Sequence, residues 1–344
     1  MSINYRAASS ALVLLALAGC ARMPLVQPLN ADVAVAIQPV DVKLGIPQPE
    51  LYAAFQRSNA GAAAAAGCGA VPGIGILLAA ACGGTMGAID ASVNAARAKT
   101  ADEIVRPLKD EIVDIKYDQV MNDALNKSLQ DVPGMQIAGI AVSKTVTPKV
   151  YEELYRASTS NSVMFVNIDY HLSIDFSTLE VSARGLLYPR SAAARKAAGL
   201  SAELPNANDD PVLALKNSAY RMNFFYQVKL PKPAATGADN VANWKADGGR
   251  LLRNGLQDGS AQIARLMADD LQRRPGTTRP AVSKVDIGNG IMADLISQTS
   301  DGKLIRYADG SLHYEALVPA SNQVSQVSQA SAAASTPAGG ATAQ

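Results

Sequence analysis

Side chains that commonly carry out catalysis or bind metal ions are few and widely separated in this sequence. The chain has three cysteines, Cys20, Cys68 and Cys82, and two histidines, His171 and His313. Their spacing fits none of the usual zinc ligand patterns. The short signatures of serine hydrolases, zinc peptidases, phosphate-binding loops and dinucleotide-binding turns are also absent. The sequence therefore predicts no catalytic residue, no bound metal and no cofactor.

The two histidines are interpreted as structural or solvated groups. His171 stands among polar residues on one side of an alternating segment, and His313 lies beside a predicted hairpin turn. The acidic pairs at 209–210 and 269–270 fall in a loop and near the end of a predicted helix, where charged side chains are normally solvated. A periplasmic enzyme whose site assembles from distant positions is therefore the third alternative for function.

The N-terminus has the pattern of an export signal. Arg6 precedes an apolar run that is too short to cross a bilayer core of about 30 Å, which needs about 20 helical residues. At the end of this run, Leu17-Ala18-Gly19-Cys20 resembles the lipobox of bacterial lipoproteins. The resemblance implies that residues 1–19 are removed and that Cys20 becomes the lipid-bearing first residue of the mature chain.

The lipoprotein resemblance also implies a location. Three acyl chains on Cys20 would hold the protein firmly, since two membrane signals already suffice for stable anchoring. Ala21 follows the cysteine, in place of the aspartate associated with retention in the inner membrane. We expect an outer-membrane protein that faces the periplasm or the cell surface, with membrane lipid as a partner through its acyl chains.

Lipidation of Cys20 would leave Cys68 and Cys82 as a pair. In the oxidising cell envelope, an even number of remaining cysteines favours a disulfide. A bond that closes a loop of roughly 15 residues would stabilise the fold by about 3 kcal/mol in the chain-entropy model. The alternative is two buried free thiols that act as small apolar side chains.

An uncharged stretch of thirty-two residues, 58–89, contains eight glycines and eleven alanines. Gly69 with Gly73, and Gly83 with Gly87, have the G-x-x-x-G spacing that lets helix backbones touch. The stretch is similar to the glycine-zipper segments of several bacterial envelope proteins. A central proline predicts two legs that fold back as a helical hairpin, which enters the membrane or packs against copies of itself. A close-packed internal helix pair and a flexible loop are the alternatives.

Three later segments alternate between apolar and polar residues, as half-buried β-strands do. The first runs from Met164 to Phe176, the second from Leu179 to Leu187 and the third from Tyr220 to Leu230. The first two segments are predicted to form an antiparallel hairpin. A helix from about Gly249 to Arg273 has one apolar stripe, which is expected to cover one face of the sheet.

These elements predict an α+β fold, in which amphipathic helices cover an antiparallel sheet. A Gly/Ala-rich helical hairpin precedes this sheet, and a small C-terminal β-meander follows it. The predicted organisation is a signal peptide (1–19), a lipid-anchored linker (20–57), the Gly/Ala-rich hairpin (58–99), an α+β domain (100–275), the β-meander (276–319) and a disordered tail (320–344).

Charge composition limits the partners. The chain has 31 Lys and Arg against 30 Asp and Glu, a formal net charge of +1, so no nucleic-acid partner is predicted. The leading hypothesis is a non-enzymatic outer-membrane lipoprotein for envelope assembly or binding, with self-association or an envelope protein as partner. The alternative is a subunit of an oligomeric pore or secretion complex, in which the hairpin from Met164 to Leu187 joins copies from other subunits in the membrane.

Overall fold

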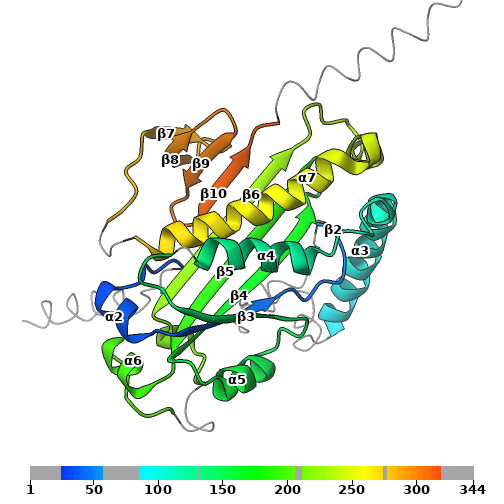
Figure 1. Cartoon of the computed structure of the whole chain (residues 1–344). Coiled ribbons are helices and arrows are strands. Elements are labelled where there is room, and N and C mark those ends of the chain that lie inside the picture. Colours follow the sequence, from blue (N-terminus) through cyan, green and yellow to red (C-terminus); the bar gives the residue numbers. More distant parts are fainter. Residues whose placement is uncertain (1–24, 57–84, 131, 206–210, 274–276, 319–344) are drawn as a thin grey trace, which may run out of the picture.

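The three segments with the strongest alternation form the centre of one sheet. The computed structural model describes residues 25–56, 85–130, 132–205, 211–273 and 277–318. It is a mixed α/β structure with a ten-stranded sheet and six helices (Figure 1). The central strands are β4 (Ser162–Leu172), β5 (Thr178–Pro189) and β6 (Tyr220–Lys229).

Seven shorter strands extend the sheet on both sides of this centre. Their order is β3-β1-β4-β5-β6-β10-β9-β8-β7, and β2 pairs with β4 outside this path. The bounds of these strands are β1 (Val40–Gly45), β2 (Tyr52–Ala53), β3 (Ile137–Ser143), β7 (Ser283–Asp286), β8 (Met292–Gln298), β9 (Gly302–Arg306) and β10 (Leu312–Ala316).

The expected antiparallel sheet is present in part. Five pairings are antiparallel, namely β4–β5, β5–β6, β10–β9, β9–β8 and β8–β7. Four are parallel: β1 with β3, β1 with β4, β2 with β4, and β10 with β6. The parallel pairs arise because strands from both ends of the described chain join the sheet beside strands that are distant in sequence.

Residues 40–45 lie inside the sheet, although the sequence analysis assigned them to a linker. They form β1, between β3 and β4. Val40, Val42 and Leu44 alternate along this strand, and all three are fully buried. This short alternation is itself a strand signal, which the Pro-containing sequence around it obscures.

Helices α4 and α7 lie across one face of the sheet, and α3 stands beside them at one margin (Figure 1). The main hydrophobic core lies between these helices and the strands, while a smaller cluster under α5 covers the end of the other face. The helix bounds are α2 (Ala31–Ala36), α3 (Thr85–Glu111), α4 (Tyr117–Gln130), α5 (Pro148–Ala157), α6 (Ala192–Ala197) and α7 (Gly237–Leu271), with a short 3₁₀ helix at Leu215–Asn217.

Helix α7 is longer than the sequence predicts and is broken near its middle. Asp247, Gly248 and Gly249 have φ values of 54°, 67° and 68°, in the left-handed region, so the chain changes direction there. The predicted helix start near Gly249 corresponds to the second section. Arg253, at the start of that section, caps the end of α3 by donating to the Glu111 carbonyl oxygen and to both oxygens of Asp114.

The first section of α7 holds the turn between β4 and β5. Trp244 is fully buried, and its Nε1 donates a hydrogen bond of 2.7 Å to the Phe176 carbonyl oxygen. Asn240 donates from Nδ2 to the Asp175 carbonyl oxygen at 2.8 Å. Phe176 has a φ of 60°, a conformation that an aromatic residue adopts only when its surroundings impose it. The turn that orients the ends of β4 and β5 is therefore fixed from the helix side.

The second section of α7 approaches the sheet through two glycines one turn apart. A Cβ atom at Gly255 would lie 2.8 Å from Leu179 Cδ2, and one at Gly259 would lie 2.8 Å from Tyr226 Cδ1. Contacts this short leave no room for a side chain. This G-x-x-x-G pair therefore packs a helix against strands rather than against another helix.

Several predicted residues lie outside the described part of the chain. They are Cys20, Cys68, Cys82, Gly69, Gly73 and Gly83. Gly87 lies in the first turn of α3, where no contacts are described. Among the described residues, no helix is both long and apolar enough to traverse a bilayer.

Candidate functional site

A row of polar side chains crosses the sheet on the face opposite α4 and α7. Pairing in register places Tyr52 (β2) beside His171 (β4), and His171 beside Glu180 (β5). The row continues through Gln227 (β6), Glu315 (β10) and Lys303 (β9). We call these six residues the polar ladder. Side chains at directly paired positions point to the same face of a sheet, so strand register alone aligns them.

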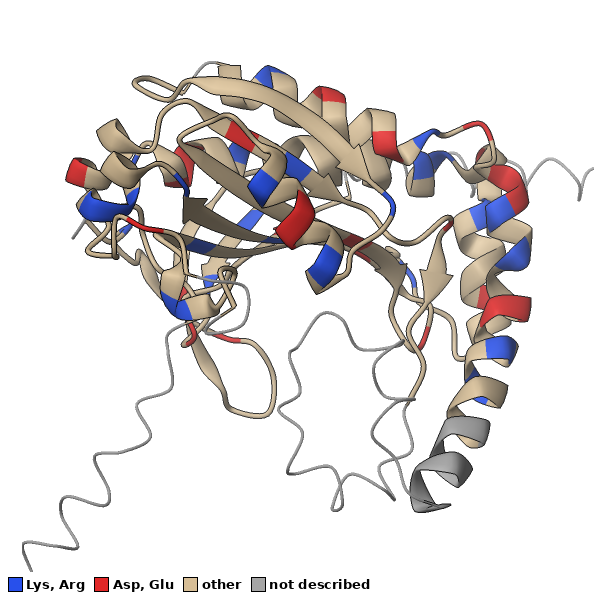
Figure 2. Ribbon diagram, turned by 90° about the horizontal axis from the view of Figure 1, so that it is seen from below, with Lys and Arg blue, Asp and Glu red and all other residues tan. Residues whose placement is uncertain are grey.

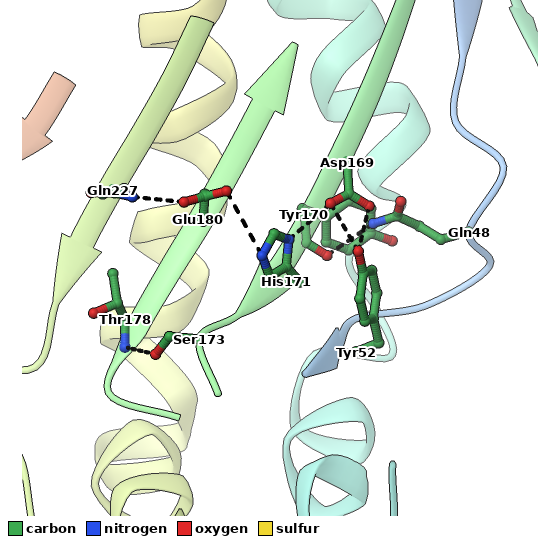
Figure 3. Close-up of polar contacts among 9 residues, drawn as sticks. All are labelled: Gln48, Tyr52, Asp169, Tyr170, His171, Ser173, Thr178, Glu180 and Gln227. Atoms are coloured by element: carbon green, nitrogen blue, oxygen red, sulfur yellow. Dashed lines mark hydrogen bonds and ion pairs between the residues drawn. The ribbon is translucent and has the colours of Figure 1, made fainter. Parts of the chain in front are cut away.

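Carboxylates face both nitrogens of the His171 ring. Nδ1 lies 2.8 Å from Asp169 Oδ2, and Nε2 lies 3.7 Å from Glu180 Oε1 (Figure 3). Asp169 is two residues before His171 on β4, so both side chains project from the same face. The His171 side chain is 18% exposed, so the ion pairs lie at a half-buried surface.

Neighbouring groups fix this cluster from both sides. The Tyr52 ring stacks on the His171 ring with centroids 5.3 Å apart. The Tyr52 hydroxyl donates to Asp169 Oδ1 at 2.8 Å. On the other side, Gln227 Nε2 donates to Glu180 Oε2 at 2.6 Å (Figure 3). Gln48 Nε2 donates to the Tyr170 carbonyl oxygen at 2.9 Å, which ties the segment before β2 to β4. The histidine ring therefore has one well-defined orientation.

The charges around His171 favour its protonated form. Burial of the ring works to lower the pKa of His171, but the hydrogen bond and charge of Asp169 and the charge of Glu180 outweigh it. The result is a pKa above the ordinary value of a histidine. The two carboxylates therefore favour the imidazolium form of His171 over the neutral ring.

His313 lies in the neighbouring row of the same face and has a contrasting environment. Its ring is stacked between Phe225, at a centroid distance of 4.2 Å, and Tyr307, at 3.7 Å. Ser311 Oγ lies 3.1 Å from Nε2, whereas the buried Nδ1 has no hydrogen-bond partner among the described residues. Burial lowers the pKa of His313 to about 4, so this ring is neutral at pH 7.

This geometry surrounds the His171 ring with fixed negative charge. A general base needs one ring nitrogen free to take a proton from a substrate. His171 has Asp169 within hydrogen-bond distance of Nδ1 and the Glu180 carboxylate 3.7 Å from Nε2. The described residues also contain no group of three or more His, Cys, Asp and Glu side chains arranged to hold a metal ion.

The sequence was compared with known protein families and with curated proteins. No known protein family model matches the sequence. No curated protein matches it either.

An apolar hollow of about 350 Å³ is the second feature of interest. It lies between the residues after β2, helix α3 and the turn between β4 and β5. Phe55, Ile104, Ile174 and Phe176 contribute to its walls, and Arg97 donates to the Gln56 carbonyl oxygen at 2.7 Å beside it. Few polar groups converge on this hollow, so the polar ladder is the better candidate for specific recognition.

Sequence reasoning placed His171 on the polar face of its strand but missed the cluster around it. Asp169 and His171 share a face by their spacing, which was a usable signal. Tyr52, Glu180 and Gln227 join them only through the register of β2, β5 and β6.

On the rest of the described surface, acidic and basic residues are interspersed, for example along α3 (Figure 2).

Proposed function

We propose that this chain is a non-enzymatic, lipid-anchored binding component of the bacterial outer membrane. In this proposal Cys20 carries the acyl chains and the polar ladder forms the surface that recognises another envelope protein. The observation that carries the proposal is the His171 ring held between Asp169 and Glu180, because these contacts make a rigid polar surface.

A preorganised surface favours binding, because little side-chain freedom is lost when a partner docks. Tyr52, Asp169 and Glu180 already have fixed orientations through their contacts in the cluster. Tyrosine is also among the residue types enriched at the centre of recognition sites. These contacts support a binding role for the exposed part of the sheet face.

The pairing of β4 and β5 favours a binding component over the alternative of a pore or secretion subunit. In that alternative the hairpin from Met164 to Leu187 would join strands of other subunits. In the described part of the chain, β4 pairs with β1 and β5, and β5 pairs with β4 and β6. Both strands thus have neighbours on each side. The third alternative, a periplasmic enzyme, gains no support from His171.

Replacing Cys20 tests the anchor. We expect Cys20→Ala to prevent labelled palmitate from being incorporated and to release the protein from the membrane fraction or leave its precursor uncleaved. Arg6→Lys keeps the positive charge of the signal and serves as the control. A Cys20→Ala protein that still takes up palmitate and stays in the membrane would exclude this anchor.

Site-specific photocrosslinking in living cells tests the binding surface. Ser182 is half-buried, pairs with Asp169 in the row beside the polar ladder and can hold a photoreactive residue. Gln257 is exposed on α7, over the opposite face of the sheet, and provides the matched control. We expect a discrete protein adduct from position 182 and none from position 257. Equal labelling at both positions, or none at 182, would contradict the proposed surface.

Two finer features also belong to this proposal. We infer a Gly/Ala-rich helical hairpin in residues 58–99, with contacts at Gly69, Gly73, Gly83 and Gly87 that let copies of the chain associate. We also infer that residues 276–319 form a β-meander unit.

The proposed disulfide between Cys68 and Cys82 is tested by alkylation before and after reduction, read by mass spectrometry. Two free thiols in envelope protein would remove the support for aligned hairpin legs.

A further inference from the structure

The two outer edges of the sheet differ in a way that bears on assembly. The strand β7 at one edge, Ser283–Asp286, contains Lys284 and Asp286, and Lys284 is paired with Asp294 at 2.5 Å. The strand β3 at the other edge, Ile137–Ser143, has the sequence IAGIAVS, with no charge and no proline. Charged residues on an edge strand oppose pairing with other chains. The edge at β3 has no such protection.

The backbone of β3 offers hydrogen-bonding groups on its outer side. Ile46 N donates to the Ser143 carbonyl oxygen at 3.1 Å, and from Gly139 to Ser143 the pairing with β1 is regular; a register shift before Gly139 leaves Ala138 without a partner in β1. Because successive residues of a strand alternate, the N–H and C=O groups of Ile140 and Val142 point away from β1. No described strand pairs with that side of β3.

We propose that β3 is the interface at which a second copy of this chain binds, by antiparallel pairing of β3 with β3 of the second copy. The twofold axis passes beside Ile140, so that Ile140 lies opposite its own counterpart and Ala138 lies opposite Val142 of the second copy. This register turns the outward-facing backbone groups of Ile140 and Val142 toward the second copy, with Ala138 at the irregular end of each strand. One sheet then continues through both copies.

Charge and shape both suit this register. Each residue of β3 meets an uncharged residue, and just beyond the strand Lys144 lies opposite Gln136 of the second copy, so no like charges are opposed. Lys144 is also neutralised by Asp118 at 2.6 Å. Like charges at paired positions would destabilise a shared sheet. A self-complementary strand of this kind is what a twofold interface requires.

A small hollow beside β3 provides a place for a side chain of the second copy. It has a volume of about 210 Å³ and lies between the end of α4 and the strand, with Leu129, Ile137, Ala138 and Ile140 among its lining residues. Val142 is an exposed apolar side chain, with 40% of its surface accessible. In the proposed register, Val142 of the second copy lies opposite Ala138, at the border of this hollow.

Mass measurement of the full chain tests the interface. We expect a dimer by light scattering or analytical ultracentrifugation in detergent, and a dissociation constant raised roughly tenfold or more by Val142→Lys, which introduces a desolvated charge. Val285→Lys on β7 is the matched control and should leave the dimer unchanged. Circular dichroism will show that both variants are folded. A monomeric parent chain, or a dimer that Val142→Lys leaves intact, overturns the proposal.

Cysteine crosslinking tests the register, in a chain whose Cys68 and Cys82 are replaced by serine. Opposed residues of an antiparallel pair have Cα atoms about 4.5 to 5.5 Å apart, within the range of a disulfide. Ile140→Cys should therefore form a crosslinked dimer on oxidation. Ala138→Cys should not, since its counterpart is four residues away, about 13 Å. A chain that associates but gives no crosslink at Ile140→Cys would contradict the β3 interface, whether or not the Gly/Ala-rich stretch also joins copies.

Discussion

At the scale of single residues, two histidines on one sheet face have pKa values shifted in opposite directions because their neighbours differ. His171 lies between carboxylates that raise its pKa, against the effect of burial. His313 lies between aromatic rings, and burial lowers its pKa to about 4. The two side chains therefore make opposite contributions to the pH dependence of stability.

The contribution of His171 is present at low pH and lost at high pH. The pKa of His171 is higher in the folded protein than in the unfolded chain, where it is about 6.5. The ion pairs therefore stabilise the fold fully below about pH 6.5. This stabilisation is lost as the pH rises through the pKa of His171 in the folded protein. We expect His171→Gln to lower the free energy of unfolding by about 1–2 kcal/mol at pH 6 and by less at pH 9.

Denaturant unfolding at the two pH values measures this difference. Glu152→Gln is a suitable control, because Glu152 forms an exposed helical ion pair with Arg156 and lies far from the histidine. Its effect should be small and the same at both pH values. A His171→Gln effect that does not change between pH 6 and pH 9 would show that the ion pairs are not its origin.

The contribution of His313 has the opposite sign. Its folded pKa is lower than its unfolded value, so the unfolded chain binds a proton between about pH 6.5 and 4 and stability falls as the pH is lowered. His313→Phe keeps a ring in the stack and removes the titration. Between pH 7 and pH 5, the free energy of unfolding should fall for both proteins. After allowance for solvent screening, we expect the fall to be about 1 kcal/mol smaller for the variant than for the parent.

Thermal or denaturant unfolding across this range gives the comparison for His313. His171→Gln serves as the counterpart, because removing a raised pKa should increase the loss of stability on acidification. If His313→Phe and the parent lose equal stability, the buried neutral ring of His313 would be excluded as a source of acid sensitivity.

At the scale of elements, the G-x-x-x-G pair of α7 shows that this spacing has more than one structural use. Gly255 and Gly259 bring the helix against β5 and β6, with Leu179, Val181 and Tyr226 in close contact. The same spacing in residues 69–73 and 83–87 was interpreted as a helix–helix contact. The G-x-x-x-G spacing indicates that another backbone packs closely against the helix. Whether a helix or a strand packs there depends on the tertiary fold.

Gly259→Ala tests this close approach. Alanine is about 1 kcal/mol better than glycine in a helix, so without the contact the change would stabilise. With the Tyr226 ring 2.8 Å from the new Cβ atom, we expect overpacking to lower the free energy of unfolding by about 1–3 kcal/mol instead. Asn254→Ala, at an exposed position of the same helix, is the control and should be neutral or slightly stabilising. Stabilisation by Gly259→Ala would show that α7 is less tightly packed on the sheet.

Helices and strands with a regular apolar pattern are located more accurately from the sequence than those without one. The long alternation in β4, β5 and β6 identifies these strands to within a few residues of their bounds. Strand β2 has only two residues, Tyr52 and Ala53, and shows no period at all. The first section of α7 has glycines at its beginning and end, which conceal a helix whose Trp244 is fully buried. Local patterns therefore miss elements that tertiary contacts hold in place.

At the scale of the whole molecule, the helix-covered sheet was predictable but the order of its strands was not. Alternation shows that a segment has one buried face, yet it carries no information on which strand is its neighbour. The parallel pair of β6 and β10 and the insertion of β1 between β3 and β4 depend on segments far apart in sequence. For the same reason, the candidate site could be predicted only as Asp169 and His171 on one strand face.

The position of β1 in the sheet also has a consequence for the order of assembly. Val40 pairs with Ser162, 122 positions later, whereas β4 and β5 are joined by a short turn. Contacts between distant segments form slowly, because a long loop must close before any contact is gained. We expect β4 and β5 to pair early, with the β1 side of β4 open to solvent in the meantime. An open strand edge is prone to aggregate. A nascent chain of this protein therefore most needs a chaperone after Leu172, the last residue of β4, has been synthesised and before β1 has paired with β4.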